Sequence, residues 1–213
     1  MKALGLIGIV LIVVIISYVF IFKQNIPDVI PAIIPTETTD FLSPTEIIRP
    51  EPSIDNSDLK QGGSSLSDPA GVYSILYPSD YTFDSQNNGQ HQRIYKAGST
   101  QKGQTEMYDG VIMVFEVIML DNQTLSDWVD NTLKQTTADG TSEVVEIKKP
   151  IQINSQPGFT YATRGLGIST YYIVQKNSQS NYAALIATSV NDPQNIGYQK
   201  EVDKILSTLE VQK

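Results

Sequence analysis

The chain offers few residues for acid–base or metal chemistry. It contains one histidine, His91, and no cysteine. A histidine-based metal site needs further ligands of the same kind, and thiolate ligation is excluded outright. His91 stands in NNGQHQR, at a turn that leads into an apparent strand, so we expect a surface histidine there. The sequence therefore predicts no metal site and no cofactor.

Serine nucleophiles occur in recognisable patterns, and the chain has no GxSxG segment. Two stretches match SxxK, Ser57 to Lys60 and Ser99 to Lys102, but the KTG triplet that accompanies SxxK in penicillin-binding folds is absent. In a serine-rich chain two such matches arise by chance. We therefore predict no catalytic residue.

Several carboxylates lie at the ends of expected strands or in loops: Asp80, Asp84, Glu106, Asp109 and Asp121. None belongs to a D-x-D-x-D-G loop of the calcium-binding kind. We expect a solvated acidic rim, and a weak calcium site stays open as the alternative.

Glu116 is the least expected charged residue, because it interrupts the apolar run VIMVFEVIML. Strand alternation places it on the same face as Ile112 and Val114. A charge on such a face must be paired, neutralised or at the rim. Arg164 and Lys176, on later strands, are the predicted partners in a structural ion pair.

Adjacent tyrosines, Tyr171 and Tyr172, are the strongest hint of a binding surface. Consecutive strand residues point to opposite faces, so one of the two is expected to be exposed. Tyrosine is common at interfaces, although most of the chain's 11 tyrosines are expected to pack within the sheet.

The first 23 residues predict a membrane anchor. Ala3 to Phe22 contain no charged residue, and 20 helical residues span about 30 Å, the thickness of the bilayer's hydrocarbon core. No A-x-A cleavage pattern follows, so a retained helix is favoured over a cleaved signal peptide. The acidic character of the stretch after Lys23 favours a cytoplasmic N-terminus and an extracytoplasmic remainder.

Residues 24–70 predict a flexible linker. They hold seven of the 11 prolines and end in the Gly/Ser-rich stretch QGGSSLSDPAG. Such a composition buries too little apolar surface to offset the entropy lost on ordering.

Residues 71–213 predict a single globular domain with two helices and a sheet of about six strands, drawn from seven candidate segments. The expected strands cover 72–78, 91–97, 111–120, 142–153, 159–164, 169–176 and 182–190, the first with a possible extension into PSDYTF. The run 111–120 is almost wholly apolar and indicates a central strand buried on both faces. The short connection NSQSN favours an antiparallel hairpin.

Two helices are expected, TLSDWVDNTLKQ and the C-terminal segment. The first begins with a capping pair, Thr124 and Asp127. The second is expected to begin at Asn191 or Asp192, with Pro193 near its first turn. Strands followed by strands, with few crossovers, indicate an α+β fold with a mostly antiparallel sheet.

This order of elements resembles the Mog1/PsbP-like α/β/α sandwich, in a membrane-anchored bacterial version. The resemblance rests on VYSILYPSDYTF, LSDWV, INSQPGFTY, YYIVQKNSQSNYAALIATSV and YQKEVDKILSTLEV, and it covers about residues 72–211. It implies the fold and a non-enzymatic binding module. No functional residue of the family carries over to this chain.

The predicted function is a membrane-tethered, extracytoplasmic binding or scaffold module that contacts a protein or cell-wall partner. A formal net charge of −8 argues against nucleic acid, whose phosphates require a basic surface. Two alternatives stay open. A small hydrolase of envelope polymers would need two converging titratable groups in a cleft, and an assembly factor for a membrane complex would need an exposed apolar patch.

Overall fold

The computed structural model describes residues 54–86, 89–102, 107–138 and 140–213. Every element below belongs to the unit Pro50–Lys213. The predicted anchor, residues 3–22, and the linker as far as residue 53 lie outside the described residues. Within the described ranges, no helix has the length and hydropathy to cross a membrane.

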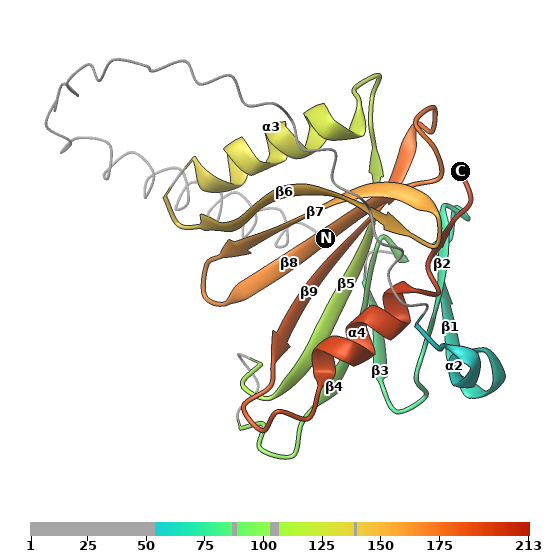
Figure 1. Ribbon diagram of the computed structural model, residues 1–213, viewed down its shortest axis with the longest axis vertical. Helices are drawn as coiled ribbons and strands as arrows, with labels where there is room; N and C mark the ends of the chain where they lie inside the picture. The colour runs from blue at the N-terminus through green and yellow to red at the C-terminus, as the bar shows by residue number, and fades with distance from the viewer. Residues whose placement is uncertain (1–53, 87–88, 103–106, 139) are drawn as a thin grey trace, which may run out of the picture. The chain divides into compact units, whose positions relative to one another are not determined.

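Seven strands form one antiparallel sheet, in the spatial order β3-β4-β5-β9-β8-β7-β6 (Figure 1). They are β3 (Thr82–Gln86), β4 (His91–Ala97), β5 (Gly110–Met119), β6 (Glu143–Ile153), β7 (Gln156–Arg164), β8 (Ile168–Gln175) and β9 (Tyr182–Asn191). The predicted hairpin of β8 and β9 is confirmed.

The predicted interior strand is β5, which pairs with β4 on one side and β9 on the other. On one face Val111, Met113 and Phe115 are fully buried. On the other face Ile112 and Val114 are only half-buried. The prediction of burial on both faces is therefore wrong for the second face of β5.

A second sheet of three strands has the order β1-β2-β10. Its strands are β1 (Ser64–Ser67), β2 (Tyr73–Tyr77) and β10 (Glu210–Val211). Strand β1 and a short helix, α2 (Ser57–Gly62), fall inside the segment predicted to be a flexible linker. That prediction is wrong for residues 57–67, because Leu59 and Leu66 are 4% exposed and join the core.

Helix α3 (Leu125–Thr137) begins as predicted, with the Thr124 hydroxyl accepting a hydrogen bond from the Asp127 N–H. Helix α4 (Tyr198–Leu206) begins later than predicted, beyond Pro193 and the loop that follows it. Asp192 still acts at its start, since its carboxylate accepts hydrogen bonds from the N–H groups of residues 196–198. Burial alone would raise the pKa of Asp192, and these donors lower it below its usual value.

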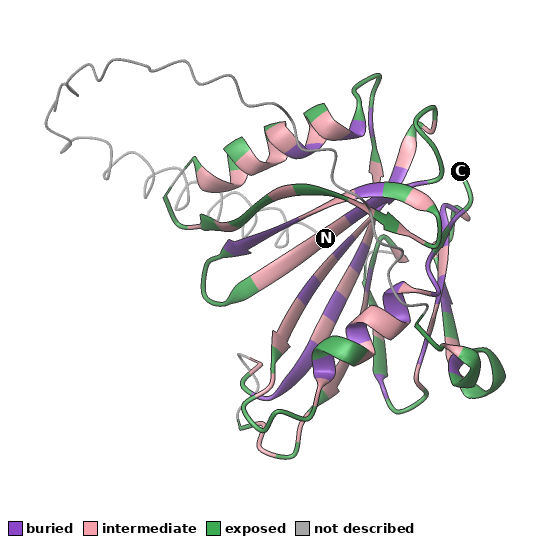
Figure 2. Ribbon diagram, in the orientation of Figure 1, coloured by how far each residue is buried: buried purple, intermediate pink, exposed green. Residues whose placement is uncertain are grey.

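The two faces of the large sheet carry separate cores. Helix α4 and the small sheet pack on the face of Phe115 and Val174, while α3 packs on the face of Ile173. Consecutive residues Ile173 and Val174 therefore serve opposite cores, as strand geometry requires. Figure 2 shows the buried positions along β5, β8 and β9 and the exposed ends of the strands. The α+β class with helices on an antiparallel sheet is confirmed, although the strands are more numerous than predicted.

Candidate functional site

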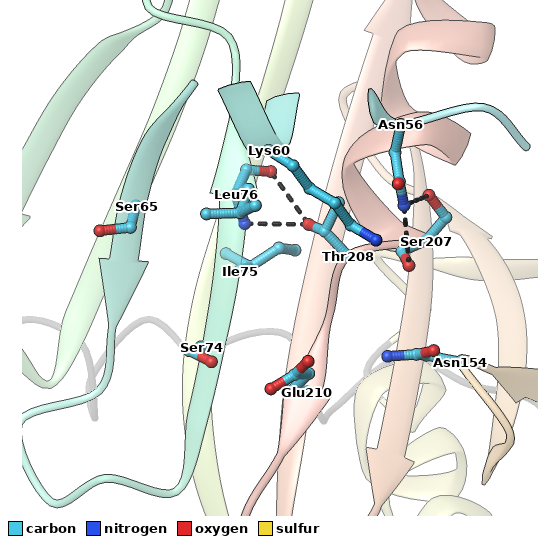
Figure 3. Close-up of a pocket in the computed structure, with 10 residues that line it drawn as sticks. All are labelled: Asn56, Lys60, Ser65, Ser74, Ile75, Leu76, Asn154, Ser207, Thr208 and Glu210. Carbon is cyan, nitrogen blue, oxygen red and sulfur yellow. Dashed lines mark hydrogen bonds between the residues drawn. The ribbon is translucent and has the colours of Figure 1, made fainter. Parts of the chain in front are cut away.

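A groove of about 380 Å³ lies beside the small sheet, where β2, β10 and the end of α4 meet (Figure 3). Residues from five separate parts of the chain line it. They are Asn56, Lys60, Ser65, Ser74, Ile75, Leu76, Asn154, Ser207, Thr208 and Glu210. Side chains with hydroxyl or amide groups dominate this lining, which makes the groove a polar surface rather than an apolar pocket.

Helix α2 forms one wall of the groove and is attached to α4. Lys204 Nζ lies 2.5 Å from Asp58 Oδ1, and Asn56 Nδ2 donates to Ser207 Oγ at 3.1 Å. Leu59 is buried beneath the helix. These contacts explain why a six-residue helix, too short to be stable alone, has a fixed place in the domain.

Thr208 takes the place of a strand residue along β2. Strand β10 pairs Glu210 with Ser74, so the same register would pair Thr208 with Leu76. Instead, the Thr208 N–H donates to Ile205 O and closes the last turn of α4. The Thr208 side-chain oxygen accepts from the Leu76 N–H at 2.9 Å and lies 3.1 Å from Leu76 O. The Thr208 oxygen therefore satisfies the Leu76 N–H, and its single hydrogen lies within reach of two acceptors, Leu76 O and, at 2.7 Å, Ile205 O.

The two-residue turn between β6 and β7 contributes Asn154 to the lining of the groove. Asn154 and Ser155 both have positive φ, 49° and 64°, as a tight hairpin turn of this length requires. The Asn154 side chain donates to Leu209 O at 3.4 Å. Just beyond the turn, the Gln156 amide donates to Val211 O at 2.7 Å and accepts from Val211 N at 2.8 Å. This side chain therefore pairs with β10 as a neighbouring strand would.

The side chains that line the groove are suited to forming hydrogen bonds with a ligand. Hydroxyl and amide groups both donate and accept, so they match a ligand with the same mixed character. Lys60 and Glu210 are the titratable residues among those that line the groove. Among the described residues, no three histidine, aspartate or glutamate side chains form a group that could hold a metal ion.

An electrostatic cluster around Lys96 lies outside the groove and holds α4 on the sheet. Lys96 Nζ lies 3.0 Å from Asp80 Oδ2 and 3.1 Å from both carboxylate oxygens of Glu201. Burial alone would lower the pKa of Lys96, but the two carboxylates raise it above its usual value. The Tyr81 hydroxyl also donates to Glu201, at 2.9 Å. Burial, followed by the charge of Glu201, raises the pKa of Tyr81.

Asp109 is the fully buried carboxylate of the described domain. Its Oδ2 accepts from Thr100 N at 2.9 Å and Thr100 Oγ1 at 2.7 Å, while Oδ1 has no hydrogen-bond partner among the described atoms. A Cβ on Gly98 would lie 2.1 Å from the carboxyl carbon of Asp109. Glycine at position 98 is therefore what allows the carboxyl group to enter the loop.

The predicted ion pair of Glu116 with Arg164 or Lys176 is wrong. Glu116 Oε1 lies 2.8 Å from His91 Nδ1, because β4 and β5 are neighbours. Arg164 pairs with Glu143 at 2.6 Å across the β6–β7 hairpin. Lys176 donates to Gln212 O at 3.1 Å. Glu116 does have a side-chain partner, as a charge on this face requires, but the order of the strands in the sheet makes that partner His91.

Tyr171 and Tyr172 point to opposite faces as predicted, but neither is exposed. Both are half-buried. Tyr171 stacks on Tyr161 with ring centroids 4.7 Å apart and packs on the α3 core, while Tyr172 packs on the α4 core. The prediction of an exposed tyrosine at this position is therefore wrong.

The rim carboxylates have diverse roles. Asp84 pairs with Arg93 at 2.5 Å, and Asp80 belongs to the Lys96 cluster. Glu106 lies outside the described residues, and the weak calcium site stays a prediction. His91 lies at the start of β4 with about half of its side chain exposed (48%), as expected.

Comparisons with solved structures return a similar overall arrangement of elements. One neighbour is the Ran-binding protein Mog1p of Saccharomyces cerevisiae, with 9% identity, a TM-score of 0.46, and coverage of 70% of this chain and 95% of that chain. Another is cyanobacterial PsbP (CyanoP) of Synechocystis sp. PCC 6803, with 12% identity, a TM-score of 0.47, and coverage of 71% and 93%. Both neighbours bear the names of the fold that the sequence resembles, Mog1 and PsbP. No family model matches the chain, and no curated protein matches it.

Sequence reasoning missed the groove because its walls come from segments far apart in the chain. One local signal was available. Residues IDNSDLK contain Asp and Asn directly before a possible helix, and the Asp55 carboxylate does accept from the Ser57 N–H at 3.0 Å. Read this way, the segment predicts helix α2 and hence one wall of the groove.

Proposed function

We propose that this protein is a membrane-tethered binding module that presents its folded domain outside the cytoplasm and holds an uncharged, polar envelope ligand in the groove. The charge-free segment from Ala3 to Phe22 supports the tether. The negative charge that follows Lys23 supports the orientation. A cell-wall glycan and a polar protein loop are the ligands whose hydrogen-bonding groups fit such a surface.

The observation that carries the proposal is the hydrogen bond from the Leu76 N–H to the side-chain oxygen of Thr208. An extended peptide could add itself to an exposed sheet edge through main-chain hydrogen bonds. Here the Leu76 N–H, the donor that an added strand would need at this position, already bonds to the Thr208 side-chain oxygen. We therefore expect a ligand in the groove to be recognised mainly through side chains, which carry hydroxyl, amide, ammonium and carboxylate groups.

The lining is less suited to the competing hydrolase. Hydrolysis by paired titratable groups needs two such groups close enough to act on one bond. Of the groove residues, Lys60 comes from α2 and Glu210 from β10, and no ion pair joins the two in the part of the chain that the structure describes. Binding is the activity that this arrangement supports best.

Photo-crosslinking in living cells tests the groove. A photoreactive amino acid replaces Ser65 or Glu210, which are exposed residues of the lining, and for comparison Gln135, an exposed residue of α3. Helix α3 packs on the other face of the large sheet, so Gln135 lies far from the groove. We expect an adduct of defined mass at positions 65 and 210 and none at 135. Equal adducts at all three positions would refute the groove as the binding site.

Protease treatment of intact cells tests the tether and its orientation separately. The full chain is expected in the membrane fraction, with the domain cleaved from outside under conditions that leave a cytoplasmic marker intact. A full-length chain that is recovered without detergent, or a domain that survives while known surface proteins are lost, contradicts the proposal.

A further inference from the structure

Four large aliphatic side chains are exposed at one end of the large sheet. They are Val144 (40% exposed), Ile147 (73%), Leu166 (100%) and Ile168 (49%), and together we name them the apolar tip. Aliphatic residues that are exposed singly are ordinary, but a group of them on one end of a domain marks an interaction surface. Figure 2 shows the exposed turn between β7 and β8 that carries Leu166.

Strand register explains why these side chains share one end. Leu166 stands in the turn GLG, between the last residue of β7 and the first of β8. Ile168 pairs with Arg164, and Val144 pairs with Thr163. At 3.3 Å per residue, Val144 and Ile168 lie within about 10 Å of Leu166 along the strands. Ile147 lies three residues beyond Val144 on the edge strand β6, about 10 Å further from the turn, and extends the exposed aliphatic surface along that edge.

The two faces of the sheet both contribute to the tip. Val144 is paired with Thr163, and Ile168 with Arg164, which are consecutive residues of β7. Consecutive strand residues face opposite sides of a sheet, so Val144 and Ile168 flank the turn from opposite sides. We call this arrangement, in which the fully exposed Leu166 has an exposed aliphatic side chain on each side of its turn, an aliphatic wedge. A wedge of this form fits a soft surface that closes around it better than a flat or convex protein surface.

The composition of the tip also favours lipid over protein. Energetically dominant residues of protein interfaces are enriched in Trp, Tyr and Arg, whereas Leu and Val are under-represented. The charges next to the tip are internally neutralised, since Arg164 pairs with Glu143 at 2.6 Å and Lys149 with Glu146 at 3.5 Å. An aliphatic wedge with balanced charges matches the boundary between headgroups and acyl chains, which lies about 5–10 Å deep.

We propose that the apolar tip docks into the surface of a lipid bilayer. This inference rests on the membrane tether of the proposed function, which keeps the domain near a bilayer. About 30 residues separate the end of the predicted anchor from the first described residue, and a flexible linker of that length would reach about 30 Å. Within that distance the bilayer is present at high effective concentration, so a wedge of modest affinity is sufficient for docking.

Depth-dependent fluorescence quenching in reconstituted vesicles tests the docking. The chain has no cysteine, so one introduced cysteine carries the only dye. Gly167→Cys keeps all four residues of the tip, and a Cβ there meets nothing within 4 Å. Ser178→Cys places the same dye in the turn at the other end of β8. The full chain is reconstituted in phosphatidylcholine vesicles that contain lipids with nitroxide on the acyl chain.

We expect strong quenching of the dye at position 167 and little at position 178. Adding Leu166→Asp to the Gly167→Cys chain is expected to lower the docked-to-free ratio about tenfold, which is the effect of losing one buried leucine. The matched control adds Gln179→Asp, the same charge at the distant turn, and leaves the quenching unchanged. Equal quenching at both dye positions, or no effect of Leu166→Asp, overturns the proposal.

Two further comparisons separate the mechanisms. Because the charges around the tip are paired and the chain is acidic, phosphatidylglycerol in the vesicles is not expected to strengthen the quenching. A strong increase with anionic lipid overturns docking by the aliphatic wedge. If the environment of the dye at position 167 changes only when membrane proteins are added to the vesicles, the tip binds a protein. That result also overturns docking into lipid. A chain that does not float with the vesicles refutes the tether, whereas a chain that floats without quenching refutes the docking alone.

Discussion

Replacing Thr208 with valine tests how the groove is built. Valine keeps the shape of threonine but removes the hydroxyl group that meets Leu76 N at 2.9 Å and Ile205 O at 2.7 Å. Thr208 is 9% exposed, and Leu76 is half-buried. The substitution leaves the N–H of Leu76 without its partner at a site where water has only partial access.

The expected loss can be derived from these contacts. Leaving a buried donor without a partner costs about 1–3 kcal/mol. The groove is open to water at one side, so we expect a value near the middle, about 2 kcal/mol of unfolding free energy. For a domain of this size that loss corresponds to a melting temperature lower by about 4–8 °C.

Thr188→Val is the matched control. Thr188 is 3% exposed, and its hydroxyl donates only to Thr170 O, at 3.2 Å. Removing it leaves no N–H unpaired, so the expected loss is about 1 kcal/mol or less. Urea unfolding of the unit that begins at Pro50, followed by the fluorescence of the single tryptophan, Trp128, measures both variants. Equal losses in the two variants would refute the argument that the Thr208 hydroxyl substitutes for a strand.

Three further perturbations probe other parts of the domain. Gly98→Ala places a Cβ where the Asp109 carboxyl group lies, so we expect about 2 kcal/mol of destabilisation in urea, and a neutral result would contradict the packing of that loop. Burial raises the pKa of Tyr161, so the neutral phenol stabilises the fold fully below its ordinary pKa of about 10, and this stabilisation is lost as the pH rises further. Tyr161→Phe removes the ionisable group and is expected to shift alkaline unfolding to higher pH. An unchanged midpoint of alkaline unfolding would count against burial of Tyr161 as the cause. Gln156→Ala removes both hydrogen bonds between the Gln156 side chain and Val211. Amide hydrogen exchange at Val211 is therefore expected to accelerate while amides at the centre of β5 stay protected. Equal acceleration at Val211 and in β5 would indicate global destabilisation instead.

Local sequence patterns predicted the elements whose stability is decided locally. The run from Val111 to Leu120 identified β5 because a buried strand needs apolar, β-branched residues. Thr124 and Asp127 marked the start of α3 because a cap satisfies main-chain groups only three residues away. In both cases the residues that decide the structure lie next to each other in the chain.

Features decided by distant contacts were not predictable in the same way. Residues 57–67 read as a linker because their few apolar residues, Leu59 and Leu66, find a core only when β2 and α4 are in place. Glu116 needed a basic partner, and the choice of His91 depended on β4 lying beside β5. Tyr171 lost its expected exposure because β7 brings Tyr161 against it.

The groove itself results from a conflict between two elements that follow each other closely. Helix α4 ends at Leu206 and β10 begins at Glu210, so the three residues between them must leave a helix and enter a strand. The Thr208 N–H closes the helix by bonding to Ile205 O, and a main chain committed in this way cannot also pair with Leu76. The strand is therefore only two residues long, and the space that its continuation would fill stays open as part of the groove. The Thr208 hydroxyl compensates Leu76 for the missing strand, so the same residue that stabilises the edge of β2 also keeps that edge from accepting an added strand.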